Sequence, residues 1–122
     1  MPHYPAEFEI PDEWLAEATF VGFKPRDRAY RSTSGATLVP LTRIEPVVRF
    51  LGYPKDFRGF DRARLVRILS GFVNDDEIEP VEAIELPGRE FCDAPYRYRV
   101  CNGFHRFYGS IAAGFELLPL AL

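Results

Sequence analysis

A change of hydrophobic period near residue 102 constrains the fold of this chain more than any other feature. In the segment YRYRV, Tyr96, Tyr98 and Val100 alternate with two arginines, which predicts a strand over 96–100 with an apolar and a basic face. The apolar side chains that follow recur at helical spacing: Phe104, Phe107, Tyr108, Ile111 and Phe115. We therefore expect the strand to turn directly into a helix that stops at Gly114.

The dipeptide Asn102-Gly103 lies at this change of period. Taken alone, Asn-Gly favours a hairpin turn. Because the following residues do not alternate with period two, we interpret Asn102 as the side-chain cap of the helix. The closing segment ELLPLAL is typical of another strand. Strand, helix and strand over 96–122 then resemble a βαβ unit, in which the helix crosses between two parallel strands.

The residues before this unit predict further helices and strands. TLVPLTRI and VEAIEL are expected to be strands, and residues 61–73 an amphipathic helix capped by Asp61. A short helix is expected over 11–20, with Asp12 as its cap. The acidic run from Asp75 to Glu79 predicts that the second helix ends before Asp75, because carboxylates disfavour the negative end of a helix.

These elements predict an α+β fold in which helices flank a short mixed sheet. We expect a domain over 38–122 and an N-terminal extension over 1–37 that packs on it. The length of 122 residues and the hydrophobic content of 47% suit one compact core.

Composition and charge exclude several classes of protein. No apolar run approaches the roughly 18 residues of a membrane span, and no export signal opens the chain, so we expect a cytoplasmic protein without a membrane partner. Cys92 and Cys101 are expected to be reduced, with Cys101 as a buried, inert thiol. No spacing of histidines and cysteines predicts a metal site. A net charge of −3 argues against nonspecific electrostatic binding of nucleic acid.

The start of the last predicted helix is the candidate binding site. A helix start offers unpaired N–H groups and partial positive charge, so it favours a phosphate or another anion. We expect Gly103 to allow close approach, the amides of Phe104, His105 and Phe107 to face the anion, and Arg106 to supply a guanidinium fork. The His105 side chain can donate one further hydrogen bond, but no partner carboxylate marks it as a general base.

Two alternatives remain open for the arginines near this site. Arg49 can reach the turn from the first strand, or it forms an ion pair on the surface. The turn itself is either an anion site or an ordinary turn whose Arg106 pairs with a nearby carboxylate.

The segments IEPVEAIEL and YRYRVCNGFHRFYGSIAAGFELLPL, with VPLTRIEP upstream, resemble the ParB/sulfiredoxin-like superfamily over residues 38–122. Members share an I-x-P-hydrophobic strand, a second strand, a [DG]-G-x-[HR]-R turn, a helix and a G-hydrophobic-Pro-hydrophobic ending. The turn here is Asn102-Gly103-Phe104-His105-Arg106. The resemblance implies that this turn binds the phosphates of a nucleotide such as ATP, ADP or CTP, with Mg²⁺ as the accompanying ion.

Departures from the family pattern narrow the expected function. Phe104 stands where sulfiredoxins carry their reactive cysteine, and Val48 stands where the related free-serine kinases carry a catalytic glutamate. We therefore do not expect this chain to reduce sulfinic acids. The serine kinase activity of the related enzymes cannot be inferred for this chain from the resemblance. The segment lacks the helix-turn-helix domain of partition ParB proteins, so we expect no sequence-specific DNA binding by this chain alone.

Two functions remain. The first is a nucleotide- or phosphate-binding domain, for which phosphotransfer or NTP hydrolysis is left open. The second is a non-catalytic protein-interaction module that keeps the fold.

Overall fold

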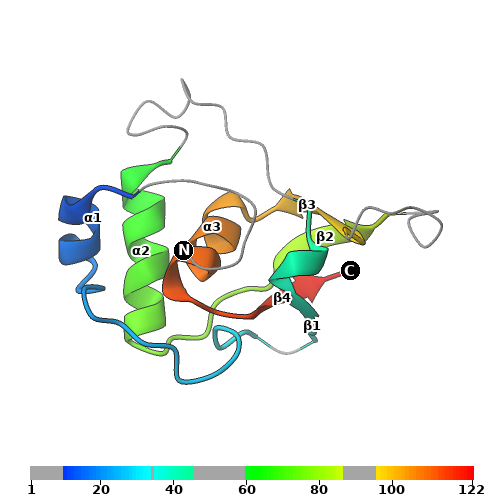
Figure 1. The fold of residues 1–122 in the computed structure, drawn as a ribbon, viewed down its shortest axis with the longest axis horizontal. Coiled ribbons are helices and arrows are strands. Elements are labelled where there is room, and N and C mark those ends of the chain that lie inside the picture. Colours follow the sequence, from blue (N-terminus) through cyan, green and yellow to red (C-terminus); the bar gives the residue numbers. More distant parts are fainter. Residues whose placement is uncertain (1–9, 34, 46–59, 87–95) are drawn as a thin grey trace.

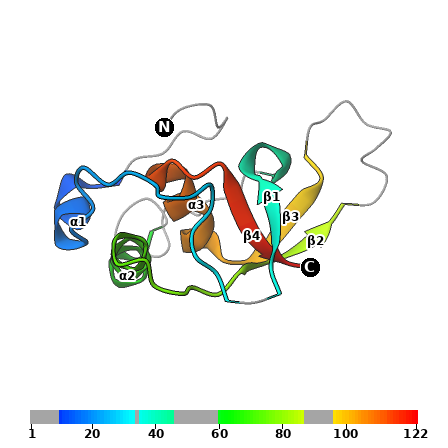
Figure 2. The same cartoon turned by 90° about the horizontal axis from the view of Figure 1, so that it is seen from below.

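The computed structural model describes residues 10–33, 35–45, 60–86 and 96–122. Their helices and strands are, in chain order, α1 (Asp12–Glu17), β1 (Thr37–Pro40), the 3₁₀ helix η1 (Leu41–Arg43), α2 (Arg62–Val73), β2 (Val81–Glu85), β3 (Tyr98–Asn102), α3 (Phe104–Ala113) and β4 (Leu117–Ala121). The α-helices gather on one side of a four-stranded mixed sheet, and α3 lies between α2 and the sheet (Figures 1 and 2). The expected α+β fold class is confirmed.

The strand order β1-β4-β2-β3 differs from the order that a simple βαβ unit would give. β3 folds back antiparallel to β2, with Tyr98 opposite Glu85. The strand beside β4 is β2 and not β3: Val81 of β2 pairs with Leu120 of β4 in a parallel register. The expectation that the strands on either side of α3 form the parallel pair is therefore wrong. The crossover that joins parallel β2 and β4 contains both β3 and α3.

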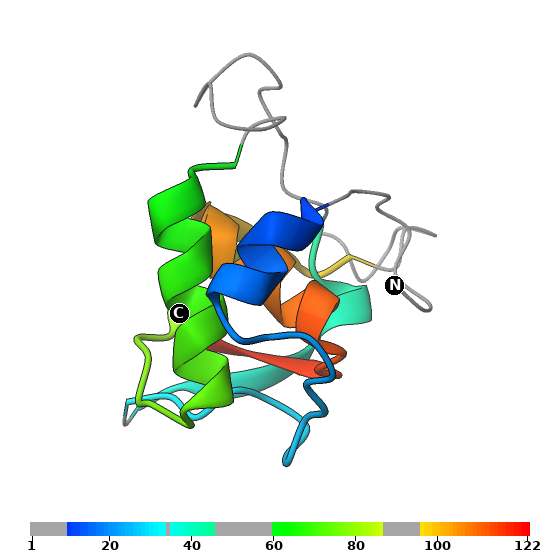
Figure 3. The same cartoon turned by 90° about the vertical axis from the view of Figure 1, so that its left-hand side faces the viewer.

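A single cluster of apolar side chains connects the helices to the sheet. Its fully buried members come from the segment just before α2, from α2 and α3, and from the sheet, and include Phe60, Leu65, Leu69, Phe107, Val81, Leu118 and Leu120. Ile10, Trp14 and Tyr30 from the N-terminal part join the same cluster. Figure 3 shows α1 lying across the face that α2 and α3 present on this side. The N-terminal residues thus contribute directly to the core.

Of the predicted helix ends, those at Asp61 and Gly114 agree with the structure, and the cap predicted at Asp12 does not. Asp61 caps α2 as expected, since its Oδ1 accepts a hydrogen bond from the Arg64 N–H at 3.0 Å. Asp12 is not a cap: α1 begins at Asp12 itself after Pro11, and no side-chain cap bond forms there. Its carboxylate instead lies in the first turn, where it favours the positive end of the helix. α3 ends at Gly114, whose φ of 85° gives the expected left-handed stop.

The end of α2 carries an aspartate at a position that favours glycine. Asp75 has a φ of 57°, its N–H donates to Phe72 O at 3.2 Å, and the N–H of Asp76 donates to Gly71 O at 2.9 Å. This pair of bonds is the Schellman arrangement, in which the left-handed residue is usually glycine. Helix α2 ends before Asp75, as the acidic run predicted.

Asp75→Gly is expected to raise the free energy of unfolding by about 0.5–1 kcal/mol, because it removes a left-handed side chain and a carboxylate from the negative end of α2. Urea unfolding measures the change. Asp76→Gly is the matched control, since it removes a carboxylate from the same helix end without relieving a positive φ, and it should gain less than Asp75→Gly. Equal destabilisation by both substitutions would contradict this account of the helix end.

Candidate functional site

Helix α3 begins at Gly103, which has a φ of 129° and a ψ of 32°. The predicted cap, Asn102, instead ends β3 opposite Glu82, and no side chain caps the helix. The reason is the sharp turn from strand to helix, which needs a backbone conformation that glycine adopts easily. A Cβ at residue 103 would also lie 2.8 Å from Val81 Cγ1, so the turn is packed closely against β2.

Three amides at the start of α3 have no acceptor among the residues that the structure describes. The N–H of Phe107 was expected to be free, but it donates to Gly103 O at 2.9 Å as the first hydrogen bond of the helix. The N–H groups of Phe104, His105 and Arg106 meet no acceptor within the described part of the chain. The candidate receptor is therefore this consecutive set of amides.

The His105 side chain has a structural partner. Its Nε2 accepts a hydrogen bond from the Asp61 N–H at 2.9 Å, its ring lies beside Phe60 and Phe104, and the residue as a whole is 9% exposed. Burial holds the pKa of His105 below its ordinary value; Asp61 opposes this shift and Arg64 adds to it. A neutral ring that accepts at Nε2 carries its proton on Nδ1, so one donor remains.

The Arg106 side chain braces α3 against the segment that leads into β2. Its Nη1 donates to Glu79 O at 3.0 Å and to Pro80 O at 2.8 Å. The carboxylate pair of the ordinary-turn alternative does not form with any residue that the structure describes. Nε and Nη2 have no acceptor there, so the guanidinium is fixed by one nitrogen and keeps donors free.

Tyr30 shares an acceptor with Arg106. Its hydroxyl donates to Glu79 O at 2.6 Å. Burial raises the pKa of Tyr30, the nearby Arg106 guanidinium lowers it, and Glu79 raises it. Tyr30, from the N-terminal part of the chain, therefore helps to fix the position of a carbonyl to which Arg106 donates.

Arg106→Met is expected to lower the free energy of unfolding by about 1–2 kcal/mol, because two backbone carbonyls lose a charged donor. Arg67→Met is the control: Arg67 is exposed on α2 and its side chain makes no described contact, so its change should stay within about 0.5 kcal/mol. Chemical unfolding of both variants checks the difference. Equal effects would show that the two carbonyl bonds contribute nothing.

The remaining expectations concern Arg49, Cys101 and metal or membrane sites. Arg49 lies outside the described residues. Cys101 is exposed rather than buried, because Val100 takes the core-facing position of β3 opposite Ala83. Within the described ranges, no group of three or more His, Cys, Asp and Glu side chains could hold a metal ion. No described helix has the length and apolar character needed to cross a membrane.

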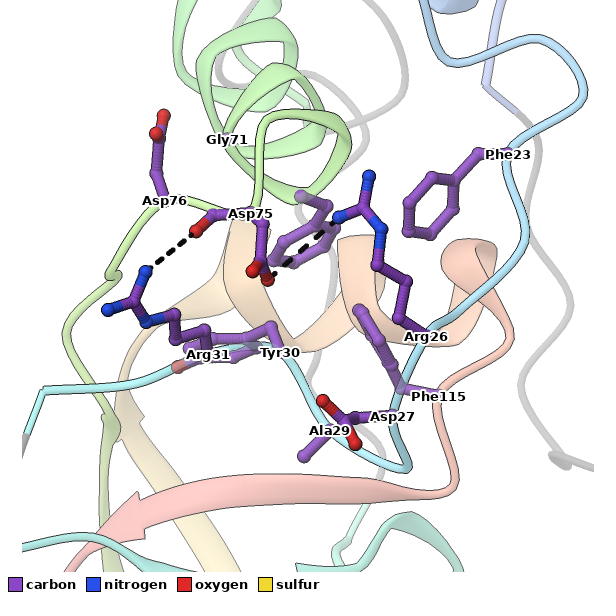
Figure 4. A pocket seen from close by; sticks show the side chains of 11 residues that line it. Phe23, Arg26, Asp27, Ala29, Tyr30, Arg31, Gly71, Asp75, Asp76 and Phe115 are labelled. Carbon is purple, nitrogen blue, oxygen red and sulfur yellow. Dashed lines mark hydrogen bonds and ion pairs between the residues drawn. The ribbon is translucent and has the colours of Figure 1, made fainter.

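A small pocket at the other end of α2 was not anticipated from the sequence. Figure 4 shows Arg26 and Arg31 approaching Asp75 from two sides, and Phe23 and Phe115 are among the aromatic residues that line the pocket. The space has a volume of about 20 Å³, enough for a water molecule and too small for a nucleotide. The cluster of arginines in RDRAYR at 26–31 is the sequence signal that could have indicated it.

Comparison with protein-family models, curated proteins and solved structures finds no match to this chain. The ParB/sulfiredoxin-like resemblance therefore stays a prediction from the sequence.

Proposed function

We propose that this chain binds a nucleotide or another phosphate-bearing small molecule at the start of α3. The observation that carries the proposal is the run of three N–H groups, on Phe104, His105 and Arg106, without an acceptor in the described structure. Such groups point along the helix axis and bear partial positive charge, so phosphate oxygens are suitable acceptors.

The side chains around these amides support the same ligand class. Arg106 is anchored through Nη1 alone, so Nε and Nη2 can donate to a phosphate from a side chain that is already positioned. The anchoring carbonyls of Glu79 and Pro80 directly precede Val81, against which Gly103 packs. The guanidinium and the turn are thus both placed by the start of β2.

We assign binding alone to this site. A general base needs a free lone pair, and the Nε2 lone pair of His105 accepts the Asp61 N–H. The Nδ1–H of the same ring can donate to a bound oxygen, which orients a ligand but removes no proton. A ParB/sulfiredoxin-like assignment, which the sequence motifs suggest, would place nucleotide phosphates at this turn.

Calorimetry with ATP, ADP, CTP and GTP in the presence of Mg²⁺, and with inorganic phosphate, tests the proposal. Asn102→Asp is the informative variant, because it places a carboxylate directly before the open amides, where it competes with an anion. Asn74→Asp makes the same chemical change at the exposed C-cap of α2 and serves as the control.

We expect at least one of these ligands to bind, Asn102→Asp to weaken it tenfold or more, and Asn74→Asp to leave its affinity within about twofold. The thermal stability of Asn102→Asp should stay close to that of the parent chain, because the favourable position of a carboxylate at the helix start is opposed by its repulsion from Glu82 on the paired strand. Absence of binding by every ligand, or equal weakening by both variants, would overturn the proposal.

A further inference from the structure

The first turn of α2 is capped by side chains from two helices, α2 and α3, which lie side by side (Figures 1 and 3). Asp61, the N-cap residue of α2, accepts the Arg64 N–H through Oδ1 at 3.0 Å. The N–H of Asp61 itself donates to Nε2 of His105, the second residue of α3, at 2.9 Å. The cap of α2 is therefore completed by a side chain of the neighbouring helix.

This arrangement resembles a capping box in which one partner comes from another helix. In a capping box, the N-cap side chain accepts the N–H of the third helical residue, and a Glu or Gln at that third position accepts the N–H of the N-cap residue. The third residue of α2 is Arg64, whose side chain has donors only. His105 therefore supplies the acceptor that a Glu or Gln at residue 64 would supply.

The His105 ring can supply this acceptor only in its neutral form. The Asp61 N–H is directed at the lone pair of Nε2, and protonation places a hydrogen on that lone pair. Two donors would then face each other across 2.9 Å, so the contact in the structure cannot persist in the imidazolium form. The cap of α2 thus depends on the protonation state of a residue on α3.

The charged groups that act on the ring belong to the start of α2. Burial is the largest effect on the pKa of His105 and lowers it; the Asp61 carboxylate raises this pKa, and the Arg64 guanidinium lowers it. On α3, the neighbouring cation Arg106 donates instead to the carbonyls before β2. Among the described residues, the carboxylate that attracts a protonated ring is therefore that of Asp61, which already accepts the Arg64 N–H.

Buried side chains on both sides limit how far this part of the chain can move. Phe60 and Leu65 are both fully buried in the core. Residues 62–64 between them are exposed. The ion pair between Arg62 and Glu17, at 2.8 Å, also lies on the surface, where such pairs contribute little. A rearrangement that follows protonation is therefore confined to residues 61–64.

We propose that His105 is a pH-sensitive switch for the first turn of α2. The neutral ring completes the cap, whereas the imidazolium releases the Asp61 N–H and draws the Asp61 carboxylate away from the Arg64 N–H. Residues 61–64 rearrange, while Phe60 and Leu65 stay in the core and the rest of α2 keeps its structure. The switch requires no ligand at the start of α3, so it is independent of the proposed anion site.

A pH titration of the full chain by ¹H–¹⁵N NMR, from pH 8 to pH 4.5, tests the proposal. It follows the ring nitrogens of His105 and the backbone N–H signals of residues 61 and 64. Arg64→Gln is the informative variant, because a glutamine at the third helical position can accept the Asp61 N–H from within α2. Arg67→Gln makes the same chemical change at an exposed position further along α2 and is the matched control. His105→Gln removes the titrating group.

We expect the Asp61 and Arg64 N–H signals of the parent chain to move upfield along the same curve as the His105 ring, with a midpoint below the ordinary value of 6.5. The Leu69 N–H should stay in place, and Arg67→Gln should behave like the parent. In Arg64→Gln the ring should still titrate while the Asp61 N–H moves much less, and in His105→Gln neither N–H should follow such a curve.

Four results would overturn the proposal. The first is a ring that titrates without a change at the N–H groups of residues 61 and 64, and the second is an equal response of the Asp61 N–H in Arg64→Gln. The third is a loss of signals throughout the chain at the same midpoint, which would mean global unfolding instead of a local switch. The fourth is a His105 ring that stays neutral down to pH 4.5.

Discussion

Gly103→Ala is expected to lower the free energy of unfolding by about 3 kcal/mol or more. The backbone at this residue has a φ of 129°, which costs an L-residue about 1–3 kcal/mol. The new Cβ would also lie 2.8 Å from Val81 Cγ1 in a fully buried part of β2, and such overpacking costs a further 1–3 kcal/mol, roughly. Thermal and urea unfolding give the difference.

Gly35→Ala separates the two causes. Gly35 has a φ of 88°, but a Cβ there would meet no atom within 4 Å, so only backbone strain of about 1–2 kcal/mol is expected. A cost for Gly103→Ala no greater than that for Gly35→Ala would show that the contact with Val81 does not constrain the turn.

His105→Ala is the substitution with the second largest expected effect, a loss of about 2–3 kcal/mol at pH 7.5. It leaves the Asp61 N–H without its acceptor and opens a gap in the ring cluster of Phe60 and Phe104. His105→Gln supplies a side-chain oxygen as a replacement acceptor and should recover part of the loss. Urea unfolding of the three proteins measures both effects, and equal stability of His105→Ala and the parent would contradict the assigned contact.

The same contact predicts a pH dependence. The folded state lowers the pKa of His105 from 6.5, so the unfolded chain binds the proton more readily. The stability that His105 contributes is fully present above pH 6.5 and is lost as the pH falls through the lower pKa of the folded state. Stability should therefore decrease from pH 7.5 toward pH 5 more steeply in the parent than in His105→Gln. Parallel curves for the two proteins would refute this linkage.

The two side chains first selected as ligand groups also hold the turn in place. His105 ties the start of α3 to the start of α2, and Arg106 ties it to the carbonyls before β2. Fixed in this way, the three amides without a described acceptor would need no rearrangement to meet the proposed anion, which would lower the entropic cost of binding. Substitutions at His105 or Arg106 will therefore change stability and ligand affinity together, whereas Asn102→Asp addresses the amides with less disturbance.

Local patterns were sufficient to predict the helices near the site. The 3.6-residue period and the Asp61 cap gave the start of α2, and Gly114 gave the end of α3. Strand β3 was predicted two residues early, over 96–100 instead of Tyr98–Asn102. These features depend on neighbouring residues, so the sequence carries their signal directly.

Contacts between distant segments could not be predicted in the same way. The bond between His105 and the Asp61 N–H spans 44 residues, and the acceptors of Arg106 are backbone carbonyls, which every residue type offers. The helical period after residue 103 and the capping preference of Asn predict Asn102 as the cap. The close approach of Val81 to Gly103, at the actual start of the helix, has no local signature in the sequence. The order of the strands likewise depends on a long-range contact, the antiparallel pairing of β3 with β2.

The most direct test of the anion receptor is a ¹H–¹⁵N NMR titration of the parent chain with the best-binding nucleotide or with inorganic phosphate. New hydrogen bonds from phosphate oxygens should shift the backbone N–H signals of Phe104, His105 and Arg106 downfield and slow their hydrogen exchange, while the N–H of Phe107, already bonded to Gly103 O, should change less. Saturating ligand that leaves these three amides unchanged, or that shifts signals only elsewhere, would contradict the account.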